Sequence, residues 1–415
     1  MAIQKKSQSD KFSILRDRIL FTLFIIILTR LGVYIPIPGI DRATFTENIS
    51  SLSLVKILNV FNGGGFSTVG IFSLGIIPYI NASIITQLLT PVVPSLSRLQ
   101  KEEGERGREE LQQITRYITL FWSFGQSLFL TSLMKPFVFD WTTFFLIKTA
   151  LTLTVGSLLV MFFAEQITEN GVGNGSSLII FVNIVASFPR LFEYKGLSLT
   201  NLLLLFLCLS ITIFCIVLVQ ESILKVGLIS ARQLKENFFA DKSNFIPLKM
   251  NQGGMMPLIF ASSLLNFFSF LLSKVPNLFI ISLITAISTS VFSRATYLIS
   301  FFILILFFSY IYINTIFDTD DIAKNLQKMT ATIVGIKPGR ETSQYLQKVM
   351  NRLTVLGTIF LTLITILPIS IDTLIQIPIS GSIGPTSFLI LVSVAIETSN
   401  QIQTYLLSFN YDEGQ

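Results

Sequence analysis

Residues 72–91 read Phe-Ser-Leu-Gly-Ile-Ile-Pro-Tyr-Ile-Asn-Ala-Ser-Ile-Ile-Thr-Gln-Leu-Leu-Thr-Pro. The stretch carries no charge, and about 20 apolar residues suffice for a helix to cross a bilayer. It is an irregular helix candidate, because Gly75 and Pro78 weaken its start and amide side chains lie inside it. Irregular helices with polar atoms at membrane depth are stable only where they pack on protein or line a cavity. The stretch therefore predicts a wall of a membrane pore.

The composition of the whole chain indicates a polytopic membrane protein. Of its 415 residues, 51% are hydrophobic and 13% are charged, whereas a soluble domain is about 25% charged. The chain contains no histidine, which removes the commonest general base and metal ligand. This rules out HExxH metal sites, Ser-His dyads and haem ligation by histidine, and we expect no enzyme activity and no cofactor or metal site.

Ten apolar stretches predict ten transmembrane helices, and hence an all-α fold. They cover about 19–35, 73–93, 117–134, 142–164, 176–189, 198–219, 252–273, 295–317, 353–371 and 384–405. With the N-terminus inside, 21 basic residues fall in the inner segments and 8 on the outer side. This asymmetry obeys the positive-inside rule and puts both termini in the inner compartment. A further apolar run, 275–293, would reverse that asymmetry if it crossed, so we expect it to be re-entrant or interfacial.

Two inner loops, 220–251 and 318–352, are long and charged. In the second loop, Gly335, Pro338 and Gly339 favour a stiff turn that presents Lys337 and Arg340 outward. Such a turn is typical of a docking surface for a partner. A plain solvated loop is the alternative.

Several long motifs, in order along nearly the whole chain, resemble the SecY family of protein-conducting channels. They are Ile35-Pro-Ile-Pro-Gly-Ile-Asp41, Leu74-Gly-Ile-Ile-Pro-Tyr-Ile-Asn-Ala-Ser-Ile-Ile85, Gln100-Lys-Glu-Glu-Gly-Glu-Arg-Gly-Arg108, Glu165-Gln-Ile-Thr-Glu-Asn-Gly-Val-Gly-Asn-Gly175, Pro247-Leu-Lys-Met-Asn251, Pro257-Leu-Ile-Phe-Ala-Ser262 and Gln401-Ile-Gln403. The resemblance implies two pseudo-symmetric five-helix halves around a central pore, 1–192 and 200–415, joined by a hinge at 193–199. It also implies a pore subunit that passes unfolded polypeptides and releases hydrophobic segments laterally into lipid, without chemistry of its own.

A channel for polypeptides of any sequence must still block ions. A narrow ring of stiff aliphatic side chains suits this task, because a hydrophobic constriction dewets and β-branched isoleucine has restricted rotamers. The resemblance assigns six positions to this pore ring: Ile76, Ile80, Ile180, Ile259, Ile390 and the small, polar Ser176. Ordinary core packing of these isoleucines is the alternative.

The segment before the irregular helix resembles the plug that closes such a channel from outside. It covers about 54–66, and its triple glycine frees the backbone for movement. The plug residues are Lys56, Ile57, Leu58, Val60, Phe61, Gly63, Gly64 and Gly65. A structured outer loop is the alternative.

Polar residues inside the predicted spans resemble the lateral gate of the family. These are Asn81, Gln126 and Asn266, whose amides could form weak hydrogen bonds between helices that part for a signal sequence. Static interhelical contacts are the alternative. For partner docking, the resemblance assigns Arg232, Lys337 and Arg340. The family usually has Arg at Lys337, and Lys keeps the charge but loses the bidentate fork.

The resemblance also implies partners and a compartment. We expect a SecE-like small membrane subunit, a SecA-type ATPase or a ribosome as the driver, precursors with signal sequences, contact with membrane lipids and no direct binding of nucleic acid. A SecG-like third subunit is possible in this family. The composition and the short loop 220–251 resemble an algal plastid-encoded SecY, which implies the thylakoid membrane with both termini in the stroma. A bacterial plasma membrane, with cytoplasmic termini, is the alternative.

A secondary transporter with broken helices is the rival function. Transporters usually bind their ion or solute through intramembrane charges. Here the candidates are few and lie mostly near span ends: Arg30, Lys148, Asp372 and Glu397. The sequence therefore favours the channel.

Overall fold

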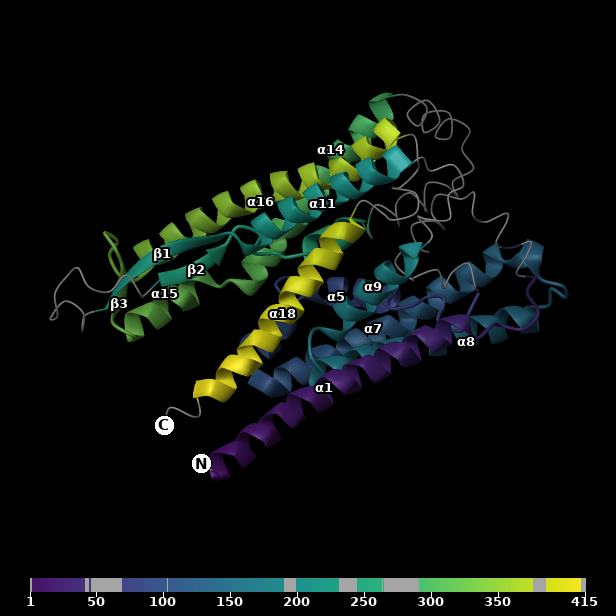
Figure 1. Cartoon of the computed structure of the whole chain (residues 1–415), viewed down its shortest axis with the longest axis horizontal. Helices are drawn as coiled ribbons and strands as arrows, with labels where there is room; N and C mark the ends of the chain where they lie inside the picture. Colours follow the sequence, from purple (N-terminus) through teal and green to yellow (C-terminus); the bar gives the residue numbers. More distant parts are fainter. Residues whose placement is uncertain are drawn as a thin grey trace. The chain divides into compact units, whose positions relative to one another are not determined.

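The computed structural model describes residues 2–41, 45, 69–102, 104–189, 199–230, 245–262, 264, 291–375 and 386–411. Helices predominate within these ranges (Figure 1). The chain forms two compact units. Unit 1 comprises Met1–Asn201 and Ile375–Gln415, and unit 2 comprises Leu202–Leu374.

Unit 1 is an assembly of helices that pack on one another. Its elements are α1 (Ala2–Tyr34), α5 (Ile77–Leu89), α6 (Pro94–Glu102), α7 (Gly104–Leu133), a 3-10 turn (Lys135–Phe137), α8 (Thr143–Asn170), α9 (Gly175–Ser187) and α18 (Ser387–Tyr411). The hairpin of α7 and α8 is the centre of the unit, since α5 packs on α7 and both α1 and α9 pack on α8. In addition, α18 packs on α9.

Side-chain caps explain where two helices of unit 1 begin. The Thr142 hydroxyl accepts a hydrogen bond from the Phe145 N–H at the start of α8. The Asn174 side chain accepts from the N–H groups of Ser176 and Ser177 at the start of α9. Each cap satisfies backbone donors that the first helical turn leaves without an intrahelical partner.

Unit 2 combines long helices with a small sheet. Its elements are α11 (Leu199–Glu221), β1 (Ile223–Ser230), β2 (Phe245–Lys249), α14 (Val291–Ile316), α15 (Thr319–Lys328), β3 (Ala331–Ile333) and α16 (Arg340–Ile375). The sheet is antiparallel in the order β2-β1-β3. Val226 faces Ile246 across one pair of strands, and Ile229 faces Thr332 across the other.

The sheet corrects the prediction of an all-α chain. Strands β1 and β2 come from the inner loop 220–251, and β3 comes from the loop 318–352. β-branched residues such as Ile223 and Val226 suit a pleated, half-buried surface. A search for long apolar runs misses such short strands.

A separate hydrophobic cluster lies beneath this sheet. It joins the three strands to α14 and α16 through the buried side chains of Val226, Leu248, Ile313, Ile333, Leu346 and Met350. The described parts of these two loops and the helix ends beside them therefore form one packed body, which we call the loop module.

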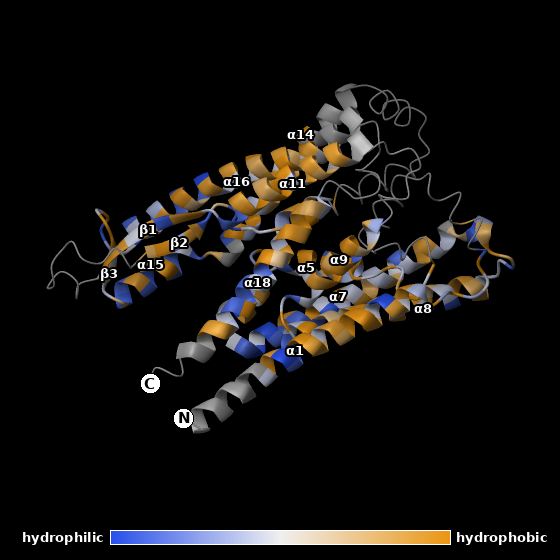
Figure 2. Ribbon diagram, viewed as in Figure 1, coloured by the Kyte–Doolittle hydropathy of each residue, from blue (hydrophilic) through white to orange (hydrophobic). Residues whose placement is uncertain are grey.

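The helices agree with most predicted spans, and several of them, including α1, α7 and α16, are longer than predicted. Nine of the ten apolar stretches coincide with a helix given above, whereas 252–273 is described only to residue 264 and is helical over 256–262. Three described stretches are long and apolar enough to cross a membrane: Thr143–Asn170, Ile299–Lys328 and Arg340–Leu367. Figure 2 shows why α16 was underestimated, since its first turns are hydrophilic and its later turns hydrophobic.

Other parts of the predicted architecture stay predictions. Most of the apolar run 275–293 and residues 193–198 of the hinge lie outside the described residues. The two compact units do not coincide with the predicted halves, because unit 1 includes α18 together with the N-terminal helices. The arrangement of ten spans in two five-helix halves therefore stays a prediction.

Candidate functional site

The irregular helix carries two of the predicted ring positions. Ile76 is the N-cap residue of α5 and is fully buried. Ile80 lies one turn later and is partly buried, and its N–H donates to the carbonyl oxygen of Ile76 at 3.1 Å. Residues four apart share a helix face, so both side chains lie on one side of α5.

Helix α9 carries Ser176 and Ile180. Ile180 is buried, as expected for a ring or core position. The hydroxyl and the N–H of Ser176 both donate to the Asn174 side-chain oxygen, at 2.7 and 3.2 Å. The departure from isoleucine at this position therefore has a local consequence, because Ser176 strengthens the cap of α9.

The remaining ring positions are buried as well. Ile390 on α18 is fully buried, and α18 packs on α9 with the rings of Phe188 and Phe388 5.9 Å apart. The structure thus brings the helices of Ile180 and Ile390 together. Ile259 belongs to unit 2, where it is buried.

The predicted plug, 54–66, lies outside the described residues, but its two flanks are described. Phe45 and Val69 are both fully buried and belong to one hydrophobic cluster with Leu130 and Leu153. On the downstream side, the Ile71 N–H donates to the carbonyl oxygen of Ile35 at 2.9 Å. The chain is therefore anchored in the same core before and after the plug.

The gate residues are only partly described. Asn81 is on α5 and is partly buried. Gln126 is on α7, and its buried side-chain oxygen has no hydrogen-bond partner in the part of the chain that the structure describes. Asn266 lies outside that part.

Two of the predicted docking residues are exposed: Lys337 lies in the turn after β3, and Arg340 is the first residue of α16. Gly335 and Gly339 both have positive φ, of 78° and 100°, which glycine adopts without steric cost. The Thr342 hydroxyl donates to the carbonyl oxygen of Lys337 at 2.8 Å and closes the turn. The third docking residue, Arg232, lies outside the described residues.

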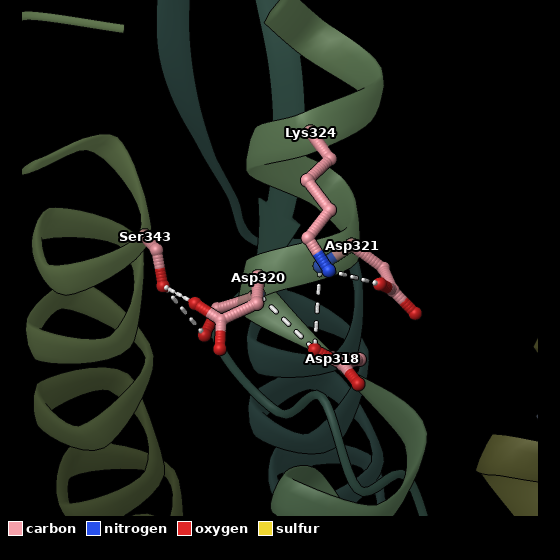
Figure 3. A network of polar contacts seen from close by, with 6 residues as sticks. Asp318, Asp320, Asp321, Lys324 and Ser343 are labelled. Atoms are coloured by element: carbon pink, nitrogen blue, oxygen red, sulfur yellow. Dashed lines mark hydrogen bonds and ion pairs between the residues drawn. The ribbon is translucent and has the colours of Figure 1, made fainter. Parts of the chain in front are cut away.

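Figure 3 shows the polar contacts at the starts of α15 and α16, the two helices on either side of this turn in the chain. The Asp318 carboxylate accepts from the N–H groups of Asp320 and Asp321 and caps α15. The Ser343 hydroxyl, in the first turn of α16, donates to the Asp320 carboxylate at 2.5 Å. These bonds join the starts of α15 and α16, and the docking turn lies in the chain between these two helices.

One pair of charged residues was missed by the sequence reasoning. Arg116 on α7 forms an ion pair with Glu165 on α8, with 2.9 Å between Nη2 and Oε2. Glu165 begins one of the recognised motifs, but nothing in the sequence indicates which basic residue faces it. Only the packing of α7 on α8 identifies the partner.

Comparisons with known proteins agree with the resemblance. The family model described as SecY matches residues 70–399. The chain is 46% identical over 411 residues to the "Protein translocase subunit SecY" of Guillardia theta, covering 98% of each chain. It is 44% identical over 417 residues to the subunit of that name from a Synechocystis strain, covering 96% of this chain and 93% of that one.

Comparison with solved structures also finds a protein-conducting channel. The solved structure titled "The structure of a protein conducting channel" matches with a TM-score of 0.66 at 15% identity, covering 95% of this chain and 93% of that one.

Proposed function

Because the chain belongs to the SecY family, it acts as the pore-forming subunit of a protein translocase, and we propose how its residues perform that task. The observation that carries this conclusion is the match to translocase subunits over nearly the full length of both chains. The protein is thus a multi-pass membrane protein that conducts polypeptides rather than small solutes.

We propose that Ile76, Ile80, Ile180, Ile259 and Ile390, with Ser176, form the ring that seals the closed channel. The burial of Ile76, Ile180, Ile259 and Ile390 supports this assignment, because a lipid-facing isoleucine would be exposed in the isolated chain. A constriction of this kind excludes hydrated ions by dewetting and offers a passing peptide no polar partner. Ten spans in two halves would surround the ring.

The plug assignment is supported by the anchored flanks. Movement of 54–66 requires fixed points on both sides, and Phe45 and Val69 provide them within one buried cluster. We propose that the segment closes the outer side of the channel at rest and moves aside when a precursor enters.

The gate assignment is supported by the buried oxygen of Gln126. Within the residues that the structure describes, this oxygen is buried without a partner, which costs about 1–3 kcal/mol, so a rearrangement that supplies a donor would be favoured. We propose that Asn81, Gln126 and Asn266 make exchangeable contacts that break when a signal sequence parts the helices.

The loop module supports a docking role. Residues of two loops that are distant in sequence share one sheet and one hydrophobic cluster. We propose that the module presents Lys337 and Arg340, together with Arg232, to a SecA-type ATPase or to a ribosome. A SecE-like subunit would complete the channel, in a thylakoid membrane with the loop module and both termini in the stroma.

One experiment tests the proposed function. The chain is reconstituted in liposomes with a SecE-type subunit, and passage of a signal-bearing precursor is followed with a SecA-type ATPase and ATP. Protection of the precursor from added protease, dependent on ATP and on the signal, is the expected result. Saturable uptake of a small solute without precursor transport would instead support a secondary transporter.

A further inference from the structure

Arg116 and Glu165 form a two-point ion pair in unit 1. The Arg116 Nε–H is shared between both carboxylate oxygens of Glu165, at 3.0 and 3.1 Å, and Nη2 adds a contact of 2.9 Å. The side chain of Glu165 is 6% exposed and that of Arg116 is 44% exposed. A buried carboxylate held in this way depends on its partner, because loss of the partner leaves an uncompensated charge.

This pair differs in its surroundings from other ion pairs of the chain. Arg106–Glu110 and Lys324–Asp321 join exposed side chains within single helices, where such pairs contribute little. Arg116–Glu165 instead connects α7 to α8. Arg116 directly precedes the predicted span 117–134 and Glu165 directly follows the predicted span 142–164, so the predicted topology puts the pair at the inner boundary of the membrane.

On one side, the pair is linked to α5. Thr115, the neighbour of Arg116, donates its hydroxyl to the Thr86 hydroxyl at 3.1 Å, and both residues are buried. A shift of Arg116 therefore moves groups that hold α5, the helix of Ile76 and Ile80.

On the other side, the pair is linked to α9. The Thr168 hydroxyl, one turn after Glu165, accepts from the Gly175 N–H at 2.9 Å. A Cβ at Gly175 would lie only 1.9 Å from the carbonyl oxygen of Ala164, so the two backbones are in direct contact beside Glu165. The inner end of α8 thus positions the first turn of α9, the helix of Ser176 and Ile180.

We propose that the Arg116–Glu165 pair is a brace that keeps α5 and α9 in the arrangement of the sealed channel. The inference rests on the proposed function, and it makes both residues positioning residues of the seal. Charge-assisted bidentate bonds fix direction as well as distance, so the pair holds α7 against α8. Helix α5 is attached to α7 and helix α9 to α8, and both attached helices carry ring positions. Breaking the pair loosens both attachments and raises the open fraction at rest.

The test compares Glu165→Gln and Arg116→Gln with the charge swap Arg116→Glu/Glu165→Arg. Glu110→Gln, which breaks the exposed pair on α7, is the matched control. Two readouts are taken from the same liposomes: ion leak without precursor, and ATP-driven transport of precursors with an intact or a weakened signal. We expect each single variant to raise the leak at least about fivefold, the lower end of typical coupling between two sites. Each should also accept the weakened signal, and the swap should reverse both effects.

Two results would overturn the brace: a wild-type leak in both single variants at normal membrane abundance, or a raised leak that the swap does not reverse. If the single variants fail to accumulate, Arg116→Lys tests the brace instead, because Lys keeps the charge but loses the two-point geometry. A raised ion leak in Arg116→Lys would support the brace, and a wild-type leak would contradict it. Failure of the wild-type protein to transport the intact precursor would count against the proposed function instead.

Discussion

The backbone N–H of Ile37 donates a hydrogen bond to the carbonyl oxygen of Val69 at 3.1 Å. This bond connects the chain before the predicted plug to the chain after it. Phe45 and Val69 lie in the same buried cluster as Ile37. The anchors of the plug are therefore part of the core of unit 1.

Deletion of Lys56–Phe66 should leave the fold intact and raise the resting ion conductance. The fold should persist because the anchors lie outside the deletion, and the conductance should rise because the outer closure of the ring is lost. Single-channel recording in planar bilayers measures the effect. A variant with a Gly/Ser linker of equal length separates loss of the plug from shortening of the loop. Conductance equal to wild type in both variants would contradict the plug.

Leucine at Asn81, Gln126 and Asn266 together should change how hydrophobic a signal sequence must be to open the channel. Interhelical polar contacts in membranes contribute roughly 0.6–2 kcal/mol each, which is enough to shift a balance between closed and open gates. Transport of a graded series of signal sequences measures the threshold.

Ser127→Ala is the matched control for the gate. It removes a buried contact of 2.9 Å between the hydroxyls of Ser127 on α7 and Thr154 on α8, next to Gln126 in sequence but outside the proposed gate. We expect it to lower thermal stability with an unchanged threshold. If the triple variant, like Ser127→Ala, lowered thermal stability and left the threshold unchanged, then Asn81, Gln126 and Asn266 would be static contacts and not gate residues.

The helices were largely predictable because apolar runs of sufficient length have few other structures available in a membrane. The strands were not predictable, because β1 pairs with β2 and with β3, and β3 begins about 100 residues after β1 ends. The first turns of α16 were missed because residues 340–352 are polar and their helical state depends on packing in the loop module.

The site was predictable to a similar degree. Motif resemblance identified Ile76, Ile180 and Ile390, and the structure added their burial. Motif resemblance did not identify the cap that Ser176 strengthens or the pairing of Arg116 with Glu165. Both depend on which side chains face each other once the helices are packed, and a single sequence carries no signal for that.

Lys337→Glu should block ATPase-driven translocation while the chain still inserts in the membrane. The residue is exposed on the docking turn, so charge reversal repels an acidic partner without disturbing the core. Lys337→Arg is the control, and it should support docking at least as well as wild type because Arg adds a bidentate fork. Translocation and co-sedimentation of the ATPase are measured together. Normal transport by Lys337→Glu would remove Lys337 from the docking surface.

Asp318→Ala should loosen the loop module and weaken docking without opening the channel. Loss of an N-cap costs about 1 kcal/mol, and here it also disturbs the start of α15 beside the Asp320–Ser343 bond. Hydrogen exchange of the α15 amides and affinity for the ATPase measure the effect. Asp321→Ala, which removes only an exposed contact with Lys324, should change both far less. Equal effects of the two variants would show that the cap has no special part in docking.

The central claim is that isoleucines from separate helices line one constriction, and site-specific crosslinking tests it most directly. Single cysteines replace Ile76, Ile80, Ile180, Ile259 and Ile390 in a chain whose Cys208 and Cys215 are changed to serine, and a precursor with one cysteine is arrested during transport. Exposed Phe121 and Leu159 serve as control positions. We predict disulfides from all five positions to the same short stretch of the precursor, and none from the controls. Crosslinks from only some ring positions, or equally from the controls, would contradict the account.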